Sequence, residues 1–524
     1  MLSRRLFPIT VFVFAALPLL TGCSATTPSF NTPPLNAPAL APRANSRTSK
    51  GAEAARRSAE TKLPAPENVT PPKGLFTVEP YLQWGNGDRT NAESVTLCWQ
   101  TPDEASGVKT DRFVSEIRVG ANGSWQKSEA APVVLPLEIP NEAPQTIWKS
   151  TLGGLTAGSL FDYRLLQDGK PVFAGRARAR RGANEPYRFA VFGDCAAGTI
   201  GQKRIAFQTF RAEPDFVFIT GDIVYDRGRA SEYREKFFPV YNAEKADPAV
   251  GAPLLRSTML LAVIGNHDAD YGNLGKWPDG LAYFYYWNPP LNGPTLAADG
   301  RNAPKTSGSA AAEKALAAAG GENYPRSASY SFDYGNSHWT VLDSNYYVDW
   351  NNQEMRAWLE KDLANAQKAT WRFVAFHIPP FHSSREHRNE QWMRSLCPLF
   401  EKYKVDVVWT GHVHNYQRSY PMTFVPTGEP DREGRVEGTW TLDQEFDGDK
   451  NTRPAAPIYV VTGGGGAPLY NPDIQQKPSD WQPFTKKYVA DTHSLTVVDV
   501  DGTKLSVRQI SEKGKELDRF VLTK

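Results

Sequence analysis

The sequence predicts an α/β fold, a sheet with helices packed against it, preceded by an all-β sandwich domain. Two observations lead to this prediction. Short alternating strands with Gly and Pro turns fill residues 74–181, which is typical of a β-sandwich of about 100 residues. After residues 185–186, apolar runs of strand length alternate with segments of helical spacing, as in α/β sheets. With 524 residues, 40% of them hydrophobic, the chain can bury the cores of two domains.

The N-terminus has the features of an export signal. Two arginines precede an apolar run over 6–20 that is too short for a membrane span. The run ends in the sequence Leu-Thr-Gly-Cys at 20–23, which resembles a bacterial lipobox. We therefore expect residues 1–22 to be a lipoprotein signal peptide and Cys23 to be the lipidated first residue of the mature protein. Residues 3–7 also resemble a twin-arginine signal, and an ordinary basic start fits them nearly as well.

The next two segments are expected to be a tether and the β-sandwich. Residues 23–72 are rich in Pro, Ala, Ser, Thr and Asn and contain almost no large apolar residues, so they predict a disordered tether. Residues 73–182 form the predicted sandwich, and the stretch over 151–163 resembles the end of a fibronectin type III domain. No cluster of reactive side chains lies in it, so we expect it to pack or to position its neighbour. Residues 183–524 form the second predicted domain.

Charge and cysteine content limit the function classes. The formal net charge is +2, and two leader arginines supply it, so the mature chain is close to neutral and no nucleic-acid binding is expected beyond nucleotides as substrates. Besides Cys23, the cysteines are Cys98, Cys195 and Cys397, which leaves room for one disulfide whose partners the sequence does not select. We expect an exported bacterial lipoprotein, held by its lipid on the periplasmic or cell-surface side of a membrane.

Polar side chains follow five apolar strands of the second predicted domain. The strands are expected over 187–192, 216–219, 259–264, 371–376 and 405–409. The residues that follow them are, in order, Asp194; Asp222 with Tyr225; Asn266 with His267; His377; and His412 with His414. Because open α/β sheets bind ligands at the carboxyl ends of their strands, we expect these side chains to meet. Carboxylate, amide and imidazole donors suit a pair of divalent or ferric ions, and a carboxylate can bridge two cations.

The remaining elements complete the α/β pattern. We expect a hairpin of 329–334 and 337–342 over a Gly-Asn turn, helices over 202–212, 352–369 and 391–403, and a strand over 458–462 before four glycines. An insertion over 281–326 begins with an aromatic run and carries an Ala-rich helix over 309–319. It is expected either to cover the site as a lid or to be a decoration.

The ordered set of motifs resembles the purple acid phosphatase branch of the calcineurin-like metallophosphoesterases. The motifs are Gly193-Asp194-Cys195-Ala196, Gly221-Asp222-Ile223-Val224-Tyr225, Gly265-Asn266-His267-Asp268, Val374-Ala375-Phe376-His377 and Gly411-His412-Val413-His414. The similarity runs from about residue 75 to the C-terminus. It implies a four-layer metallophosphoesterase sandwich, with two mixed sheets flanked by helices, after the all-β sandwich. Ala196 departs from the family, which has Gly there, and Cys195 beside a predicted ligand is unusual.

The resemblance also implies a metal centre. Asp194, Tyr225 and His414 are expected to hold Fe3+. Asn266, His377 and His412 are expected to hold a divalent ion, Zn2+, Fe2+ or Mn2+, and Asp222 is expected to bridge the two. Tyr225 distinguishes this branch, since the broader superfamily has a histidine at the position of Ala196. His267 is expected to contact the phosphate. After the fourth motif the family places further histidines, for which His382 and His387 are available and His387 has the better spacing.

The predicted activity is therefore hydrolysis of phosphate esters at a binuclear metal centre. In the acid-phosphatase-like reaction, a metal-bound hydroxide attacks phosphorus in line on a small-molecule phosphomonoester. Two alternatives remain open at this point. One is a phosphodiesterase or nucleotide-cleaving enzyme that uses the same metals. The other is a catalytically inert surface lipoprotein whose β-domain binds a partner.

Overall fold

The structure is a computed structural model that describes residues 69–87, 93–102, 112–120, 122–296 and 300–524. The predicted signal peptide, Cys23 and nearly all of the predicted tether lie outside the described residues. Within the described ranges, no helix combines the length and the apolar character that crossing a membrane requires.

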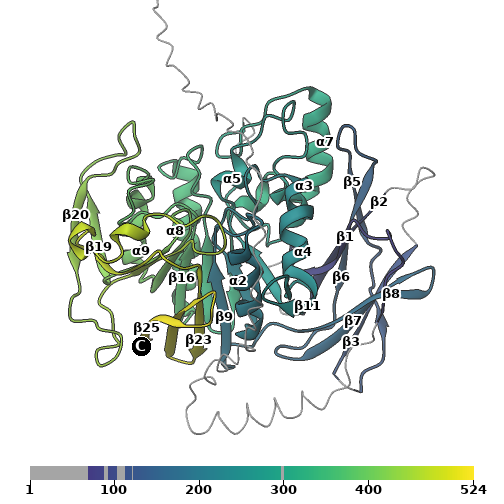
Figure 1. The fold of residues 1–524 in the computed structure, drawn as a ribbon, viewed down its shortest axis with the longest axis horizontal. Coiled ribbons are helices and arrows are strands. Elements are labelled where there is room, and N and C mark those ends of the chain that lie inside the picture. The colour runs from purple at the N-terminus through teal and green to yellow at the C-terminus, as the bar shows by residue number, and fades with distance from the viewer. Residues whose placement is uncertain (1–68, 88–92, 103–111, 121, 297–299) are drawn as a thin grey trace, which may run out of the picture. The chain divides into compact units, whose positions relative to one another are not determined.

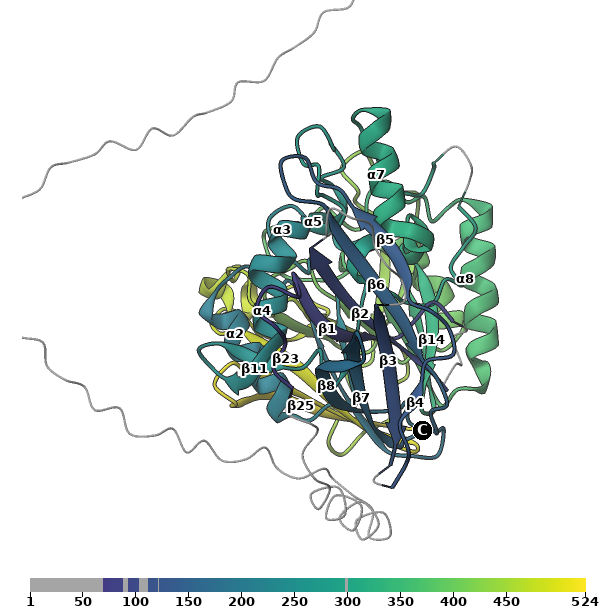
Figure 2. The same ribbon diagram turned by 90° about the vertical axis from the view of Figure 1, so that its right-hand side faces the viewer.

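The N-terminal part of the described chain contains only strands. Two four-stranded antiparallel sheets have the orders β1-β2-β6-β5 and β4-β3-β7-β8 (Figure 2). The strands are β1 (Val78–Gln83), β2 (Val95–Pro102), β3 (Phe113–Val119), β4 (Gln126–Lys127), β5 (Val133–Leu137), β6 (Gln145–Leu152), β7 (Leu160–Gln167) and β8 (Lys170–Arg178). Alternate side chains point into the space between the sheets, where Trp99 stacks on Trp148 with ring centroids 5.8 Å apart.

Two mixed sheets follow after Arg178 (Figure 1). The six-stranded sheet runs β13 (Met259–Ala262), β10 (Phe216–Ile219), β9 (Tyr187–Phe192), β23 (Ser494–Asp501), β24 (Lys504–Ser511), β25 (Glu516–Thr523). The seven-stranded sheet runs β14 (Tyr330–Tyr334), β15 (Ser337–Val341), β16 (Trp371–Ala375), β17 (Val407–Thr410), β21 (Ile458–Thr462), β18 (Tyr416–Ser419), β22 (Thr485–Val489). Two small hairpins pair β11 (Asn242–Asp247) with β12 (Gly251–Pro253) and β19 (Met422–Pro426) with β20 (Gly438–Leu442).

The described residues include eight α-helices, and the three longest of them begin at side-chain caps. They are α2 (Ile200–Arg211), α3 (Ala230–Glu232), α4 (Phe238–Tyr241), α5 (Asn266–Ala269), α6 (Tyr283–Tyr286), α7 (Ala310–Gly320), α8 (Gln353–Asn365) and α9 (Cys397–Lys402). Single turns of other helix types are Tyr233–Phe237, Gly321–Asn323, Arg326–Ala328, Ala366–Lys368, Trp392–Leu396, Pro472–Ile474 and Pro478–Asp480. The side chain of Thr199 caps α2, Ser309 caps α7 and Asn352 caps α8, each by accepting a backbone N–H of the first turn.

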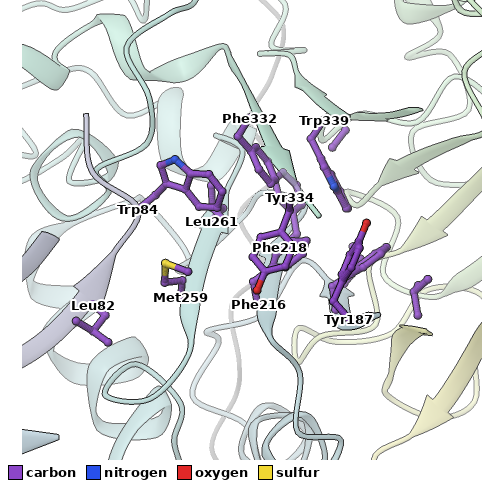
Figure 3. Packing of buried hydrophobic residues seen from close by; sticks show 14 of the residues in the cluster. Leu82, Trp84, Tyr187, Phe216, Phe218, Met259, Leu261, Phe332, Tyr334 and Trp339 are labelled. Carbon is purple, nitrogen blue, oxygen red and sulfur yellow. The ribbon is translucent and has the colours of Figure 1, made fainter. Parts of the chain in front are cut away.

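The two mixed sheets pack face to face and form the central core. Phe189 of β9 contacts Trp339 of β15 with ring centroids 5.1 Å apart, and Phe373 and Trp409 of the next two strands lie at 5.6 and 6.1 Å. Figure 3 shows Phe216, Phe218, Phe332 and Tyr334 in the same layer. The continuous apolar runs of these strands are explained by burial of both faces of each sheet.

Helices cover the outer faces, which gives four layers. Phe192 points away from the central core and stacks on Tyr241 of α4, and residues of α2 join the same cluster. On the other sheet, Phe376 stacks on Phe400 of α9, and α8 packs beside them. The predicted fold class is confirmed: a four-layer sandwich of two mixed sheets flanked by helices, after an all-β region.

The described parts of the insertion over 281–326 pack against the rest of the protein. Its aromatic run forms α6, whose four residues are all buried. The Ala-rich helix is α7, and at its end Gly321 has φ +55° and lies against the side chain of Leu135 in β5. A Cβ atom at Gly321 would meet the methyl groups of Leu135 at 3.1 and 3.2 Å, so this close approach favours glycine.

Candidate metal centre

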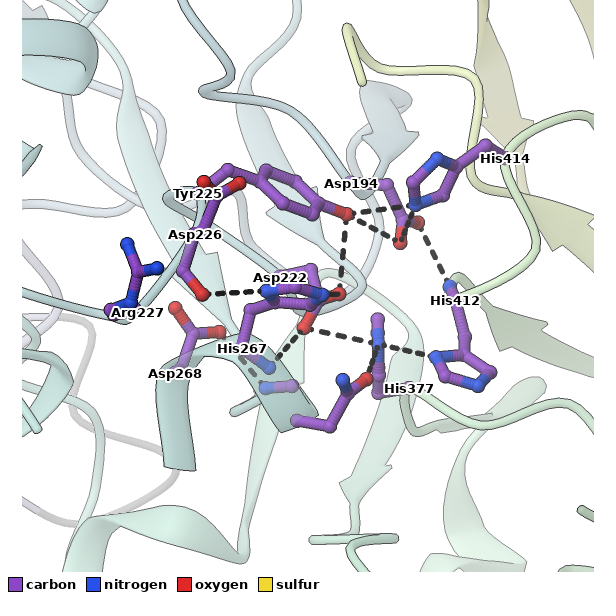
Figure 4. Close-up of polar contacts among 12 residues, drawn as sticks. Asp194, Asp222, Tyr225, Asp226, Arg227, His267, Asp268, His377, His412 and His414 are labelled. Atoms are coloured by element: carbon purple, nitrogen blue, oxygen red, sulfur yellow. Dashed lines mark hydrogen bonds and ion pairs between the residues drawn. The ribbon is translucent and has the colours of Figure 1, made fainter. Parts of the chain in front are cut away.

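All seven side chains predicted to bind metal lie together at one edge of the two sheets. They follow strands β9, β10, β13, β16 and β17. The first three strands run parallel in one sheet, and β16 and β17 run parallel in the other, so within each sheet the strand ends point the same way. Figure 4 shows Asp194, Asp222, Tyr225, His377, His412 and His414 converging on one point, with His267 beside them.

Unusual backbone conformations place three of these side chains. Asp194, Asp222 and His412 have φ values of +56°, +47° and +66°, in the left-handed region that non-glycine residues seldom adopt. Gly221 just before Asp222 has φ +91°, and a Cβ atom there would lie 2.5 Å from the His377 ring. Glycine is therefore needed at position 221, because a side chain there would collide with the ring of His377.

One group of donors surrounds one oxygen of Asp222. The Tyr225 hydroxyl lies 3.2 Å from Oδ2 of Asp222, 3.2 Å from Oδ1 of Asp194 and 2.9 Å from Nε2 of His414. Candidate ligand atoms of Asp194, Asp222 and His414 all lie within 4.8 Å of one another. Two carboxylates, a phenol and an imidazole thus face one small volume, a donor set that fits a hard cation.

A second group surrounds the other oxygen of Asp222. Oδ1 of Asp222 lies 3.2 Å from Nε2 of His377, and that nitrogen lies 3.0 Å from the amide oxygen of Asn266. Nδ1 of His412 lies 3.2 Å from the same nitrogen of His377. Asp222, His377 and His412 offer ligand atoms within 4.8 Å of one another. Asp222 therefore belongs to both groups, with one oxygen in each.

The histidines have the hydrogen bonds that metal-binding imidazoles need. Nδ1 of His377 donates to the carbonyl oxygen of Thr220 at 2.8 Å, and Nδ1 of His414 donates to that of Pro468 at 2.7 Å. Nε2 of His412 donates to the carboxylate of Glu390 at 2.8 Å. Because each outer nitrogen is used as a donor, the inner nitrogen of each ring is the one directed at the site. These residues fit a binuclear metal centre.

The pKa values of the buried side chains indicate that added positive charge would stabilise the site. Burial lowers the pKa of His412 to about 3 and that of His414 to about 4, so both rings are neutral. Burial opposes protonation of His377 too, but Asp222 and Asp194 face it and raise its pKa to about 10. Burial and the neighbouring Asp222 also raise the pKa of Asp194. Two buried carboxylates that hold a proton on an adjacent imidazole would bind cations strongly.

The two predicted catalytic histidines lie on opposite sides of the donor groups. Nδ1 of His267 donates to the carbonyl oxygen of Asp226 at 2.8 Å, and its Nε2 is 3.9 Å from Asp222. His387 packs on His412 with ring centroids 4.0 Å apart. His382 instead is buried, and Nε2 of its ring contacts the carbonyl oxygen of His387 at 3.3 Å. Of the two histidines after the fourth motif, His387 is thus the one beside the site.

Three residues of the site were missed in the sequence analysis. The carboxylate of Glu390 contacts Nδ1 of His387 and Nε2 of His412, each at 2.8 Å, and so orients both rings. Tyr470 stacks on His414 with ring centroids 4.0 Å apart. Asp268 accepts the backbone N–H groups of Gly265 and Ile223, which ties two motif loops together. The motif sequence Gly-Asn-His-Asp was a signal for Asp268, but no local pattern pointed to the other two.

The two unusual positions of the first motif have structural explanations. Cys195 is buried, and its thiol contacts the carbonyl oxygen of Ile223 at 3.4 Å, away from the donor groups. Burial raises the pKa of this thiol, so it stays protonated. The backbone of Ala196 pairs with that of Val224, and its methyl group fits in the core. Cys98, Cys195 and Cys397 are all free thiols, so no disulfide forms among them.

Comparison with known proteins shows which class of protein the sequence and the fold resemble. Residues 187–416 match the family described as calcineurin-like phosphoesterase. Purple acid phosphatase 23 of Arabidopsis thaliana is 33% identical over 142 residues, which cover 26% of this chain and 25% of that protein. Purple acid phosphatase 1 of Ipomoea batatas is 24% identical over 383 residues, covering 71% of this chain and 68% of that protein. A purple acid phosphatase from yellow lupin (Lupinus luteus) seeds shares the fold with a TM-score of 0.58 and 19% identity, over 88% of this chain and 74% of that chain.

Residues 187–416 are therefore similar to calcineurin-like phosphoesterases. Purple acid phosphatases are among the proteins that the chain resembles in sequence, and one of them shares its fold, so the predicted resemblance is confirmed at that level. Phosphoester hydrolysis is the activity that this similarity supports. The fibronectin-like character of the all-β region and the lipid anchor remain predictions.

Proposed function

We propose that the protein is a phosphomonoesterase of the purple acid phosphatase type with a binuclear metal centre. One observation carries the proposal: two groups of buried donors share Asp222, with one carboxylate oxygen in each group. In the proposed centre, Asp194, Tyr225 and His414 would hold the first metal, Asn266, His377 and His412 would hold the second, and Asp222 would contribute to both. Phenolate and carboxylate oxygens favour Fe3+ at the first position. The second position, richer in imidazole, suits Zn2+, Fe2+ or Mn2+.

The residues around the centre have separate roles in the proposed reaction. Two bound cations would acidify water and neutralise charge on the phosphate. Because Nδ1 of His267 donates to the carbonyl oxygen of Asp226, the other ring nitrogen of His267, Nε2, is the atom that can donate to a phosphate oxygen. Because Nδ1 of His387 donates to the carboxylate of Glu390, Nε2 of His387 is the atom that can give a proton to the leaving-group oxygen. Glu390 also orients His412, and thereby couples the acid to a metal ligand.

Parallel assays test the proposal. The purified protein, loaded with metal, is offered a phosphomonoester, a phosphodiester and a nucleotide, and we expect the monoester to have the highest kcat/KM. A clear preference for the diester would favour the phosphodiesterase alternative. No turnover of any of the three by a folded protein with full metal content would contradict the proposal and favour the binding-protein alternative.

Substrates with different leaving groups separate the two histidines. In His387→Ala we expect kcat for an alkyl phosphate to fall about 100-fold or more, but that for p-nitrophenyl phosphate by about tenfold at most, because a good leaving group needs little acid assistance. In His267→Ala, which removes a phosphate contact, we expect similar losses for both substrates. If kcat fell equally for both substrates in His387→Ala, His387 would not be the residue that protonates the leaving group.

We further propose that the protein is exported and anchored through a lipid on Cys23. The proposal rests on the apolar leader, the lipobox-like end of that leader and the polar tether that follows. Changing Cys23→Ser should move the protein from the membrane fraction to the soluble fraction with catalytic activity retained. An unchanged distribution between membrane and soluble fractions would contradict the anchor.

A further inference from the structure

A cationic aromatic patch lies beside the candidate metal centre and is used by none of the roles above. It consists of Arg227, Tyr271 and Trp277, with Arg229 behind. The guanidinium carbon of Arg227 lies 4.4 Å from the ring centroid of Trp277 and 5.8 Å from that of Tyr271. Arg229 contacts the same indole at 5.4 Å. All four side chains are half-buried.

The two arginines differ in their partners. Arg229 pairs with the buried carboxylate of Asp279 at 2.7 Å, so its charge is neutralised within the protein. Among the described residues, the Arg227 guanidinium forms no ion pair with a carboxylate, and the backbone N–H of Arg227 donates to the carboxylate of Glu232 at 2.9 Å. Arg227 is therefore held by its loop and by two aromatic rings, with a free positive charge that can bind an anion.

The patch continues directly from the donor groups. Arg227 follows Tyr225 by two residues in the loop after β10. The ring of His267 lies 4.6 Å from that of Tyr225 and 6.2 Å from that of Tyr271, so it connects the centre with the patch. Figure 4 shows Arg227 next to Asp226, on the side of His267 away from His412 and His414. A group bound at Arg227 would therefore lie beyond His267, the residue that is proposed to contact the phosphate.

We propose that Arg227, Tyr271 and Trp277 form a leaving-group subsite for substrates that carry a second anionic group and a planar ring beyond the scissile phosphate. A nucleoside diphosphate has this chemistry: Arg227 takes the inner phosphate, and the base lies against the exposed parts of the aromatic rings. This inference rests on the proposed function and names a substrate class for that site.

The reaction of such a substrate is a balanced hydrolysis. The oxygen of one water bonds to the terminal phosphorus, and the bond from that phosphorus to the bridging oxygen breaks. The bridging oxygen leaves on the inner phosphate with its electron pair. For ADP the products are AMP, inorganic phosphate and one proton released to solvent. Arg227 would stabilise the charge that develops on the leaving phosphate.

Substrate ratios test the subsite. Arg227→Gln removes the charge and keeps most of the side chain, and Trp277→Leu removes the ring. In Arg227→Gln we expect kcat/KM for ADP to fall about tenfold or more relative to that for p-nitrophenyl phosphate, as for loss of a charge-assisted contact. Trp277→Leu should lower the same ratio. The control Arg385→Ala removes an exposed arginine paired with Asp473 and should leave the ratio unchanged. An unchanged ratio in Arg227→Gln would overturn the proposal.

A binding measurement separates this proposal from the proposed function. Calorimetry with the methylene analogue of ADP, which cannot be cleaved at the bridge, should give an affinity that falls about tenfold or more in Arg227→Gln. If the wild type hydrolyses no phosphate ester but the analogue binds and depends on Arg227, the proposed function fails and the subsite stands. Equal affinity in wild type and Arg227→Gln would show that Arg227 does not bind the inner phosphate.

Discussion

Asp222→Asn should abolish turnover and empty both metal positions together. The amide keeps the volume of the side chain but has only one oxygen and no charge, while Asp222 places one oxygen in each donor group. We expect kcat to fall by about 1,000-fold or more, which corresponds to the loss of about 4 kcal/mol of transition-state stabilisation. The measurement is kcat together with metal content of the purified variant.

A neighbouring carboxylate provides the control for this variant. Asp270 is exposed, lies four residues after Asn266 in the chain and belongs to neither donor group. Asp270→Asn should therefore keep both metals and lose less than about tenfold in kcat. Full metal content and near-normal turnover in Asp222→Asn would show that Asp222 is not the bridge.

Tyr225→Phe should remove the colour of the iron-loaded protein. A phenolate bound to Fe3+ absorbs visible light by charge transfer, and no other described tyrosine hydroxyl contacts both Asp194 and Asp222. We expect a purple or pink wild type, a variant without the band, and iron binding weakened by about tenfold or more, while some hydrolysis persists because the bridge remains. The visible spectrum and an iron titration check this.

Tyr470→Phe is the matched control for the colour. Tyr470 stacks on His414 but lies outside the two donor groups, so its variant should keep the band. A band that survives in Tyr225→Phe would require another charge-transfer ligand. Cys195 is the nearest thiol in sequence, and its contact with the carbonyl oxygen of Ile223 directs it away from that role.

The sequence predicted those parts of the site that local patterns encode. An apolar strand followed by Gly-Asp or Gly-Asn places a side chain at the carboxyl end of the strand, so the positions of Asp194, Asp222 and Asn266 followed from strand and turn chemistry alone. The hairpin of β14 and β15 was likewise predictable, because Gly335 with φ +55° and Asn336 form its turn.

The sequence did not predict contacts that the fold creates between distant segments. Glu390 reaches His412 from the loop after β16, and Tyr470 reaches His414 from the loop after β21. The contact of Arg227 with Trp277 joins the loop after β10 to a segment beyond α5. Such pairs depend on where two loops meet above the sheet edge, and no periodicity or motif within either segment records that.

The most direct test of the central claim is a metal titration of the wild-type protein. Metal is removed with a chelator, iron and zinc are returned in measured amounts, and phosphatase activity is followed against bound metal per chain. Two donor groups that share Asp222 predict an inactive stripped protein whose activity rises to a plateau only when two metal ions are bound per chain. Activity that survives complete removal of metal, or that is already maximal with one ion per chain, would contradict the binuclear centre.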